Sequence, residues 1–229
     1  MSQVVVMLWL TAALTSASVD PAPGPEPSPT PVSWELDLKY EHPQRIEVQL
    51  PGEASPTVYW YMVYTVTNNE PRTIRFFPTF QLVTGDLRVL DTDIGISPLV
   101  FNAIKERHKL THQYLVSPSE AIGDLLKGDD HARQSVAIWR AGELDVNSFR
   151  VFVAGLSGET RFVPNPAHDA TQPETATVAD DAGRPREQVV NPAHFTLRKT
   201  LELRYELPGS ADARSVVRPV FRGQRWIMR

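Results

Sequence analysis

Cysteine is absent from this chain of 229 residues. That absence excludes a disulfide scaffold, a cysteine-ligated zinc site, an iron–sulfur cluster and thiol catalysis. A large excess of one charge is also lacking, since the formal net charge is −4, and this balance argues against nucleic acid as a partner. There is no glycine-rich phosphate loop, so nucleotide chemistry has no cradle. We expect no cofactor.

Long hydrophobic runs are equally scarce. Residues 4–14 form an apolar run of 11 that only Thr11 interrupts, whereas a transmembrane helix takes roughly 20 residues. This run suits the core of a secretory signal, and small residues follow it at once. We expect a signal peptide over residues 1–17, cleaved after Ala17. The segment before the run has no Lys or Arg, and a buried β-strand is the alternative. No transmembrane segment is expected in the mature chain.

Proline then occupies every second position from Pro21 to Pro31. Such a run favours an extended polyproline conformation. We interpret residues 18–33 as a linker, which is either a semi-rigid spacer or a leader with no role of its own. The expected destination is the periplasm, the cell envelope or the extracellular medium.

From Trp34 onward, apolar and polar residues alternate with a period of two. The pattern is clear over residues 34–40 and 45–50, and clearest over residues 195–207. Strands with one dry and one wet face are typical of antiparallel sheets. We therefore predict a mainly β fold in which residues 34–229 form a single antiparallel β-sandwich.

Two segments interrupt the β pattern. Ser97-Pro98 and Ser117-Pro118 are helix-start signals, the second with Glu120 completing a capping box. We predict a short inserted helical segment over about residues 98–127. Residues 164–194 hold many prolines and few large apolar side chains, so we predict a long, disordered loop there. The strands on either side of this loop are natural hairpin partners.

An aromatic strand supplies a family resemblance. Residues 59–69 read Tyr-Trp-Tyr-Met-Val-Tyr-Thr-Val-Thr-Asn-Asn, and an aromatic strand that ends in Tyr-x-Val-x-Asn before a turn resembles a central strand of immunoglobulin-like domains in exported bacterial proteins. The resemblance covers about 30 residues and implies an immunoglobulin-like sandwich. It carries over no catalytic residue, and the fold alone assigns no function.

Histidines and aspartates are the candidate metal ligands. His108 and His112 stand four residues apart, which places them on one face of a helix, and Asp129, Asp130 and His131 form a second cluster in a turn. Lys105 and Arg107 surround the first pair with positive charge, so a solvated helix face is the competing interpretation. Only if the two clusters met in space would a metal site be favoured.

Two features suit binding rather than catalysis. The aromatic side chains of Tyr59, Trp60 and Tyr61 could hold a sugar ring, although a fully buried central strand is the alternative. Residues 198–229 carry eight basic and three acidic side chains. These basic groups either pair within the domain or meet an acidic polymer or an anionic membrane surface.

No catalytic motif emerges, so we predict a protein that is not an enzyme. The expected function is that of an exported protein-interaction or cell-envelope structural module, whose partner is another envelope or secreted protein. The alternatives are a metal-binding protein or metal-assisted hydrolase that uses the His and Asp clusters, and a carbohydrate-binding module.

Overall fold

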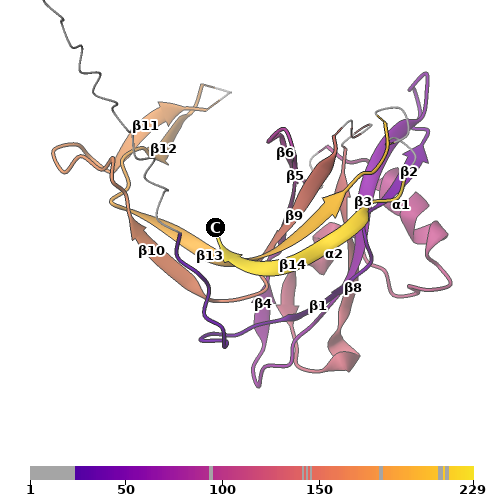
Figure 1. Ribbon diagram of the computed structural model, residues 1–229, viewed down its shortest axis with the longest axis horizontal. Helices are drawn as coiled ribbons and strands as arrows, with labels where there is room; N and C mark the ends of the chain where they lie inside the picture. The colour runs from indigo at the N-terminus through magenta and orange to yellow at the C-terminus, as the bar shows by residue number, and fades with distance from the viewer. Residues whose placement is uncertain are drawn as a thin grey trace, which may run out of the picture.

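The computed structural model describes residues 24–92, 95–140, 142, 144, 146–180, 183–210, 214 and 217–229. The predicted signal peptide and the first part of the predicted linker lie outside these residues. Antiparallel strands are the main regular structure of the described chain, and the helices are short (Figure 1). None of the described helices has the length and apolar character needed to span a bilayer.

The first sheet is organised around one long strand, β3, which contains the aromatic segment at residues 59–67. Its four strands are β1 (Asp37–Tyr40), β2 (Gln44–Val48), β3 (Thr57–Thr67) and β8 (Arg133–Trp139). Strands β1 and β2 pair one after the other with one edge of β3, and β8 pairs with the opposite edge. Residues 41–43 interrupt the strand pairing between β1 and β2, which run in the same direction along β3.

The second sheet is organised around β13 (His194–Glu206). Its other strands are β5 (Thr79–Thr84), β6 (Val89–Asp91), β9 (Ser148–Ala154), β10 (Thr160–Pro164) and β14 (Val220–Met228). Strand β14 pairs with one edge of β13, while β10 and then β9 pair with the other edge. The break at Pro78 separates β5 from the short strand β4 (Ile74–Phe76), because proline cannot donate to a ladder.

The two sheets pack face to face over one hydrophobic core. Trp60 of β3 meets Phe149 of β9 edge-on at 6.0 Å, and Tyr64 of β3 stacks on Phe80 of β5 at 4.8 Å. Leu203 of β13 is fully buried in the same cluster. These cross-sheet contacts make a β-sandwich, as the alternating pattern predicts.

The outer face of β3 is also covered, by an inserted segment. Helix α1 (Pro98–Arg107) starts at Ser97 and lays Val100 and Ile104 over the outer side chains of β2, β3 and β8. Helix α2 (Pro118–Ala121) has the predicted capping box, but it is only one turn long. The prediction of helix to about residue 127 is wrong, because Ile122 is extended and β7 (Gly123–Leu125) pairs with β4 instead. Strand pairing there outweighs local helix propensity.

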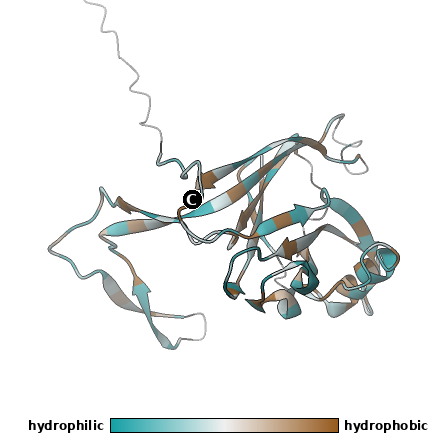
Figure 2. Ribbon diagram, turned by 90° about the horizontal axis from the view of Figure 1, so that it is seen from below, coloured by the Kyte–Doolittle hydropathy of each residue, from teal (hydrophilic) through white to brown (hydrophobic). Residues whose placement is uncertain are grey.

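Residues 164–194, predicted as a disordered loop, instead contain a β-hairpin. Its strands are β11 (Thr175–Ala179) and β12 (Pro185–Val189). As predicted, the flanking strands pair, with Pro164 opposite His194. Figures 1 and 2 show that this hairpin, β10 and the first half of β13 project away from the sandwich. We call this projection the arm, and the rest of the sandwich the body.

The end of the proline-rich segment lies against the sandwich. The backbone N–H of Ser28 donates to Glu159 Oε1 at 2.9 Å, and Arg161 donates to Ser28 Oγ at 3.0 Å. The basic residues near the C-terminus are partly paired within the fold, since Arg222 contacts Glu206 at 2.6 Å and Lys199 contacts Glu35 at 2.8 Å. Much of the positive charge of residues 198–229 is therefore neutralised internally.

Candidate metal centre

The end of helix α1 and the strand interruption between β1 and β2 bring three potential metal ligands together. The helix ends at Arg107, and His108 caps it by donating its backbone N–H to Ile104. A turn then brings His112 back, with its N–H bonded to the His108 carbonyl at 2.7 Å. Glu41 is fixed opposite by a bond from its N–H to the Val63 carbonyl at 2.8 Å. One ligand atom from each of Glu41, His108 and His112 lies within 4.8 Å of the other two.

Each imidazole presents a nitrogen to the Glu41 carboxylate. His108 Nδ1 lies 3.9 Å from Oε2, and His112 Nε2 lies 3.7 Å from Oε1. The side chains are 9%, 17% and 37% exposed for His108, His112 and Glu41, so the cluster is open on its Glu41 side. Tetrahedral bonds of about 2.0–2.2 Å place ligand atoms about 3.3–3.6 Å apart. The two distances from Glu41 to the imidazoles are therefore within a few tenths of an ångström of the spacing that a bound ion requires.

A chain of hydrogen bonds determines which nitrogen of His108 carries the proton. The Glu41 carboxylate can only accept, so Gln44 Nε2 donates to it at 2.7 Å, and this orients Gln44 Oε1 as an acceptor. Tyr61 O–H donates to that oxygen at 3.1 Å. The Tyr61 oxygen also accepts from Arg107 at 3.3 Å. Its hydroxyl proton is thus already used.

The direction of the hydrogen bond between Tyr61 and His108 follows from these contacts. His108 Nε2 lies 3.0 Å from the Tyr61 oxygen, and the proton between them has to come from the histidine. When the ring is neutral, the proton is on Nε2 and the lone pair of Nδ1 faces Glu41. A bare nitrogen and a carboxylate oxygen then face each other at 3.9 Å, an arrangement that a cation between them would stabilise.

The charge states fit that arrangement. Burial is the largest influence on the pKa of His108 and lowers it; Glu41 opposes this effect, while His112 and Arg107 reinforce it. The ring is therefore neutral at pH 7, which is the form that binds metals. Burial likewise raises the pKa of Tyr61, so its hydroxyl keeps the proton that it donates to Gln44.

Of the neighbouring cations, the two lysines are directed elsewhere, whereas Arg107 stays close enough to lower the pKa of His108. Lys109 pairs with Glu106, and the Lys105 ammonium lies over the Phe101 ring at 5.8 Å. Arg107 donates to the Arg45 carbonyl at 2.9 Å as well as to Tyr61. Positive charge around the histidines was the sequence-based argument against a metal, and these contacts weaken it.

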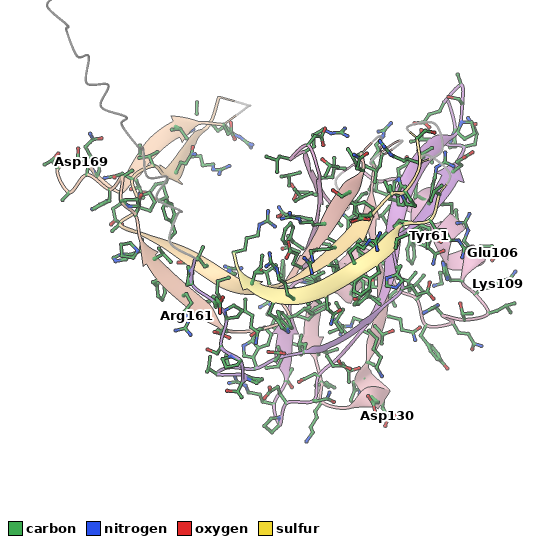
Figure 3. The ribbon with its side chains drawn as sticks, viewed as in Figure 1. Tyr61, Glu106, Lys109, Asp130, Arg161 and Asp169 are labelled. Atoms are coloured by element: carbon green, nitrogen blue, oxygen red, sulfur yellow. The ribbon has the colours of Figure 1, made fainter. Side chains whose placement is uncertain are left out.

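The second predicted cluster does not join the first. Asp129, Asp130 and His131 form a single 3-10 turn with exposed side chains. Within the described part of the chain, the one group of three close ligand atoms is the one containing Glu41. Figure 3 shows Asp130 at the lower end of the body, away from Glu106 and Lys109 of the α1 region. The predicted set of five ligands is thus divided, and only His108 and His112 come together.

The three aromatic residues of β3 proposed for sugar binding are interior residues. Tyr59, Trp60 and Tyr61 are at most 1% exposed. Trp60 faces the inter-sheet core, whereas Tyr59 and Tyr61 face helix α1. None of the three rings is open to a sugar. Tyr61 has a different role, because its hydroxyl links His108, Gln44 and Arg107.

Glu41 is the ligand that sequence reasoning missed. It stands 67 positions before His108, and no local spacing connects the two. The available signal was that Glu41 directly follows the alternating strand at residues 34–40. That strand pairs with β3.

Comparisons with family models, with curated proteins and with solved structures gave no match. The chemistry of the site therefore has to be inferred from its own residues.

Proposed function

We propose that this chain is an exported, non-enzymatic β-sandwich protein that binds one divalent transition-metal ion through Glu41, His108 and His112. The observation that carries the proposal is the meeting of His108 Nδ1 with the Glu41 carboxylate at 3.9 Å, beside the Tyr61 contact that favours an unprotonated Nδ1. Two imidazoles and a carboxylate suit Zn²⁺ better than Ca²⁺ or Mg²⁺, which prefer oxygen ligands. Tyr61 and Gln44 serve as the outer partners that orient the ligands.

The proposed export rests on the sequence. The apolar run at residues 4–14 and the proline-rich segment after it support a cleaved leader, and a chain without cysteine avoids unwanted disulfides in an oxidising compartment. The immunoglobulin-like relationship stays a proposal that rests on the aromatic strand β3.

Titration calorimetry of the mature protein with ZnCl₂ tests metal binding. We expect a stoichiometry of one, and a loss of affinity of at least 100-fold in His108→Ala, His112→Ala and Glu41→Gln. His131→Ala is the matched control, because it removes an exposed histidine from the separate cluster, and it should bind like the wild type. Because His108 is buried, circular dichroism should verify the fold of each variant.

Two results would overturn the proposal. Binding that is equal in wild type and Glu41→Gln would show that the metal sits elsewhere. Turnover of a generic ester by the zinc-loaded protein, lost in His112→Ala, would contradict the non-enzymatic part and favour a metal-assisted hydrolase.

A second candidate function, protein interaction, is favoured by the arm. Phe162 and Phe195 are 71% and 46% exposed, and every residue of β12 is exposed. Isolated two-stranded ribbons are marginally stable in water, so a partner that covers the arm would stabilise it. The proposed partner is another envelope or secreted protein.

Cross-linking in intact envelopes should give an adduct that Phe162→Ser abolishes. The matched exposed change in the body, Leu87→Ser, should leave the adduct intact. An adduct unaffected by Phe162→Ser would contradict this role.

A further inference from the structure

A groove of about 730 Å³ lies next to the candidate metal centre. One wall is formed by His42 and the first residues of β2, and the other by residues 217–219, which precede β14. Arg107, at the end of helix α1, closes it on the side of the metal ligands. Its volume is in the range of pockets that hold small organic ligands.

The groove has a surplus of positive charge. Three arginines line it, Arg45, Arg107 and Arg218, against one carboxylate, Glu47. Glu47 is already paired with Arg45 at 2.9 Å. Within the described part of the chain, Arg107 and Arg218 face no carboxylate in an ion pair. Guanidinium groups without an acidic partner are well suited to carboxylate or phosphate oxygens.

Apolar residues complete the lining. Pro43, Ile46, Val217 and Pro219 contribute to the same walls. The ring of His42, which also lines the groove, is stacked on Phe221 at 5.0 Å. The guanidinium of Arg218, that of Arg107, which also donates to the Arg45 carbonyl and to Tyr61, and the apolar walls together suit a ligand with an anionic head and a compact apolar body.

Two residues belong to both the groove and the metal centre. Gln44 lines the groove and holds the Glu41 carboxylate at 2.7 Å. Arg107 lines the groove and donates to Tyr61, which bonds His108. The groove and the candidate metal centre are therefore neighbours joined by shared side chains, and charges within a Debye length of about 8 Å at physiological ionic strength interact. A divalent ion at Glu41 would raise the potential in the groove.

We infer that the groove binds a small organic anion, whose carboxylate or phosphate head contacts Arg107 and Arg218, and that metal occupancy strengthens this binding. The second half of the inference rests on the proposed metal function; the first half does not. Because such coupling is reciprocal, the anion should strengthen metal binding by the same factor.

Titration calorimetry with phenyl phosphate, benzoate and the neutral benzyl alcohol tests the inference on the metal-free and the zinc-loaded protein. We expect one molecule of at least one anion to bind, no binding of benzyl alcohol, and affinity at least fivefold higher with zinc. Arg218→Gln should weaken anion binding at least tenfold. Arg186→Gln, which alters an exposed arginine on the arm, should leave it unchanged.

The variants separate anion binding in the groove from its enhancement by zinc. His112→Ala should still bind the anion but show no enhancement by zinc, and Arg218→Gln should still bind zinc. Binding of only one of the two anions would support the inference and identify the head group. The inference is overturned if neither anion binds, if benzyl alcohol binds as well as the anions, or if Arg218→Gln binds like the wild type. Equal anion affinity with and without bound zinc would overturn the coupling alone.

Discussion

The body and the arm share a strand but not an environment. Strand β13 runs through both, and its first five residues are mostly exposed, whereas most residues from Lys199 onward are buried. In the body, β3 is covered on one face by the second sheet and on the other by helix α1. In the arm, every residue of β12 and four of the five residues of β10 are exposed, and hydrophilic side chains mark much of β12 (Figure 2). Strand pairing alone thus builds the arm, while layered packing stabilises the body.

The largest expected difference comes from the same substitution at two positions of β13. Leu203→Ala opens a cavity in the inter-sheet core, where the side chain is 0% exposed, and should lower the free energy of unfolding by about 2–5 kcal/mol. Leu197→Ala, in the arm half, should cost less than about 1 kcal/mol. Urea unfolding followed by tryptophan fluorescence measures both. Equal losses would mean that the arm is part of the same cooperative core.

Zinc binding should stabilise the body but not the arm, because the three proposed ligands all belong to the body. Zinc at 100 times its dissociation constant should raise the free energy of unfolding by about 2.7 kcal/mol. Hydrogen exchange should show slower exchange in α1 and in residues 41–44, and no change in β11 and β12. The His112→Ala variant controls for non-specific zinc effects. If zinc slowed hydrogen exchange only in the arm, the proposed site at Glu41, His108 and His112 would be contradicted.

A smaller effect tests the outer partner of His108. Tyr61→Phe keeps the buried ring but removes the oxygen that accepts the His108 proton and donates to Gln44. Loss of such a partner typically reduces metal affinity about 10-fold or more, or about 1.4 kcal/mol. Tyr59→Phe is the matched control on the same face of β3, and it should bind zinc like the wild type. Equal affinities in both variants would remove Tyr61 from the account.

The pH dependence of stability gives the last comparison. Since burial lowers the pKa of His108 in the folded protein, the unfolded chain takes up that proton first as the pH falls through about 6.5. The metal-free protein should therefore lose stability below that pH, until the folded ring is protonated as well. His108→Gln should show a smaller loss between pH 7 and pH 5, and His194→Gln in the exposed arm should retain the wild-type loss. Unfolding at a series of pH values would show whether the two variants differ in this way.

Much of the body could be predicted because its signals are local. The alternation over residues 34–40, 45–50 and 195–207 and the caps at Ser97 and Ser117 are properties of a few neighbouring residues, and the structure confirms strands and helix starts there. Period-two burial also implied two packed sheets, which is what the core shows.

The errors come from contacts between distant segments. Residues 123–125 form a strand because β4 is available to pair with them, and the hairpin in the arm closes through a ladder that composition does not reveal. The metal centre was half predicted for the same reason. The spacing of His108 and His112 is visible in the sequence, whereas Glu41 reaches them only because β1 and β2 both pair with β3.

The protonation of His108 is the most direct test of the metal centre. Long-range ¹H–¹⁵N spectra of the metal-free protein at pH 7 distinguish the two neutral tautomers and the charged ring. The hydrogen-bond chain through Gln44 and Tyr61 predicts a neutral His108 with the proton on Nε2, and a large shift of the Nδ1 resonance when zinc is added. A proton on Nδ1, or a charged ring at that pH, would contradict it.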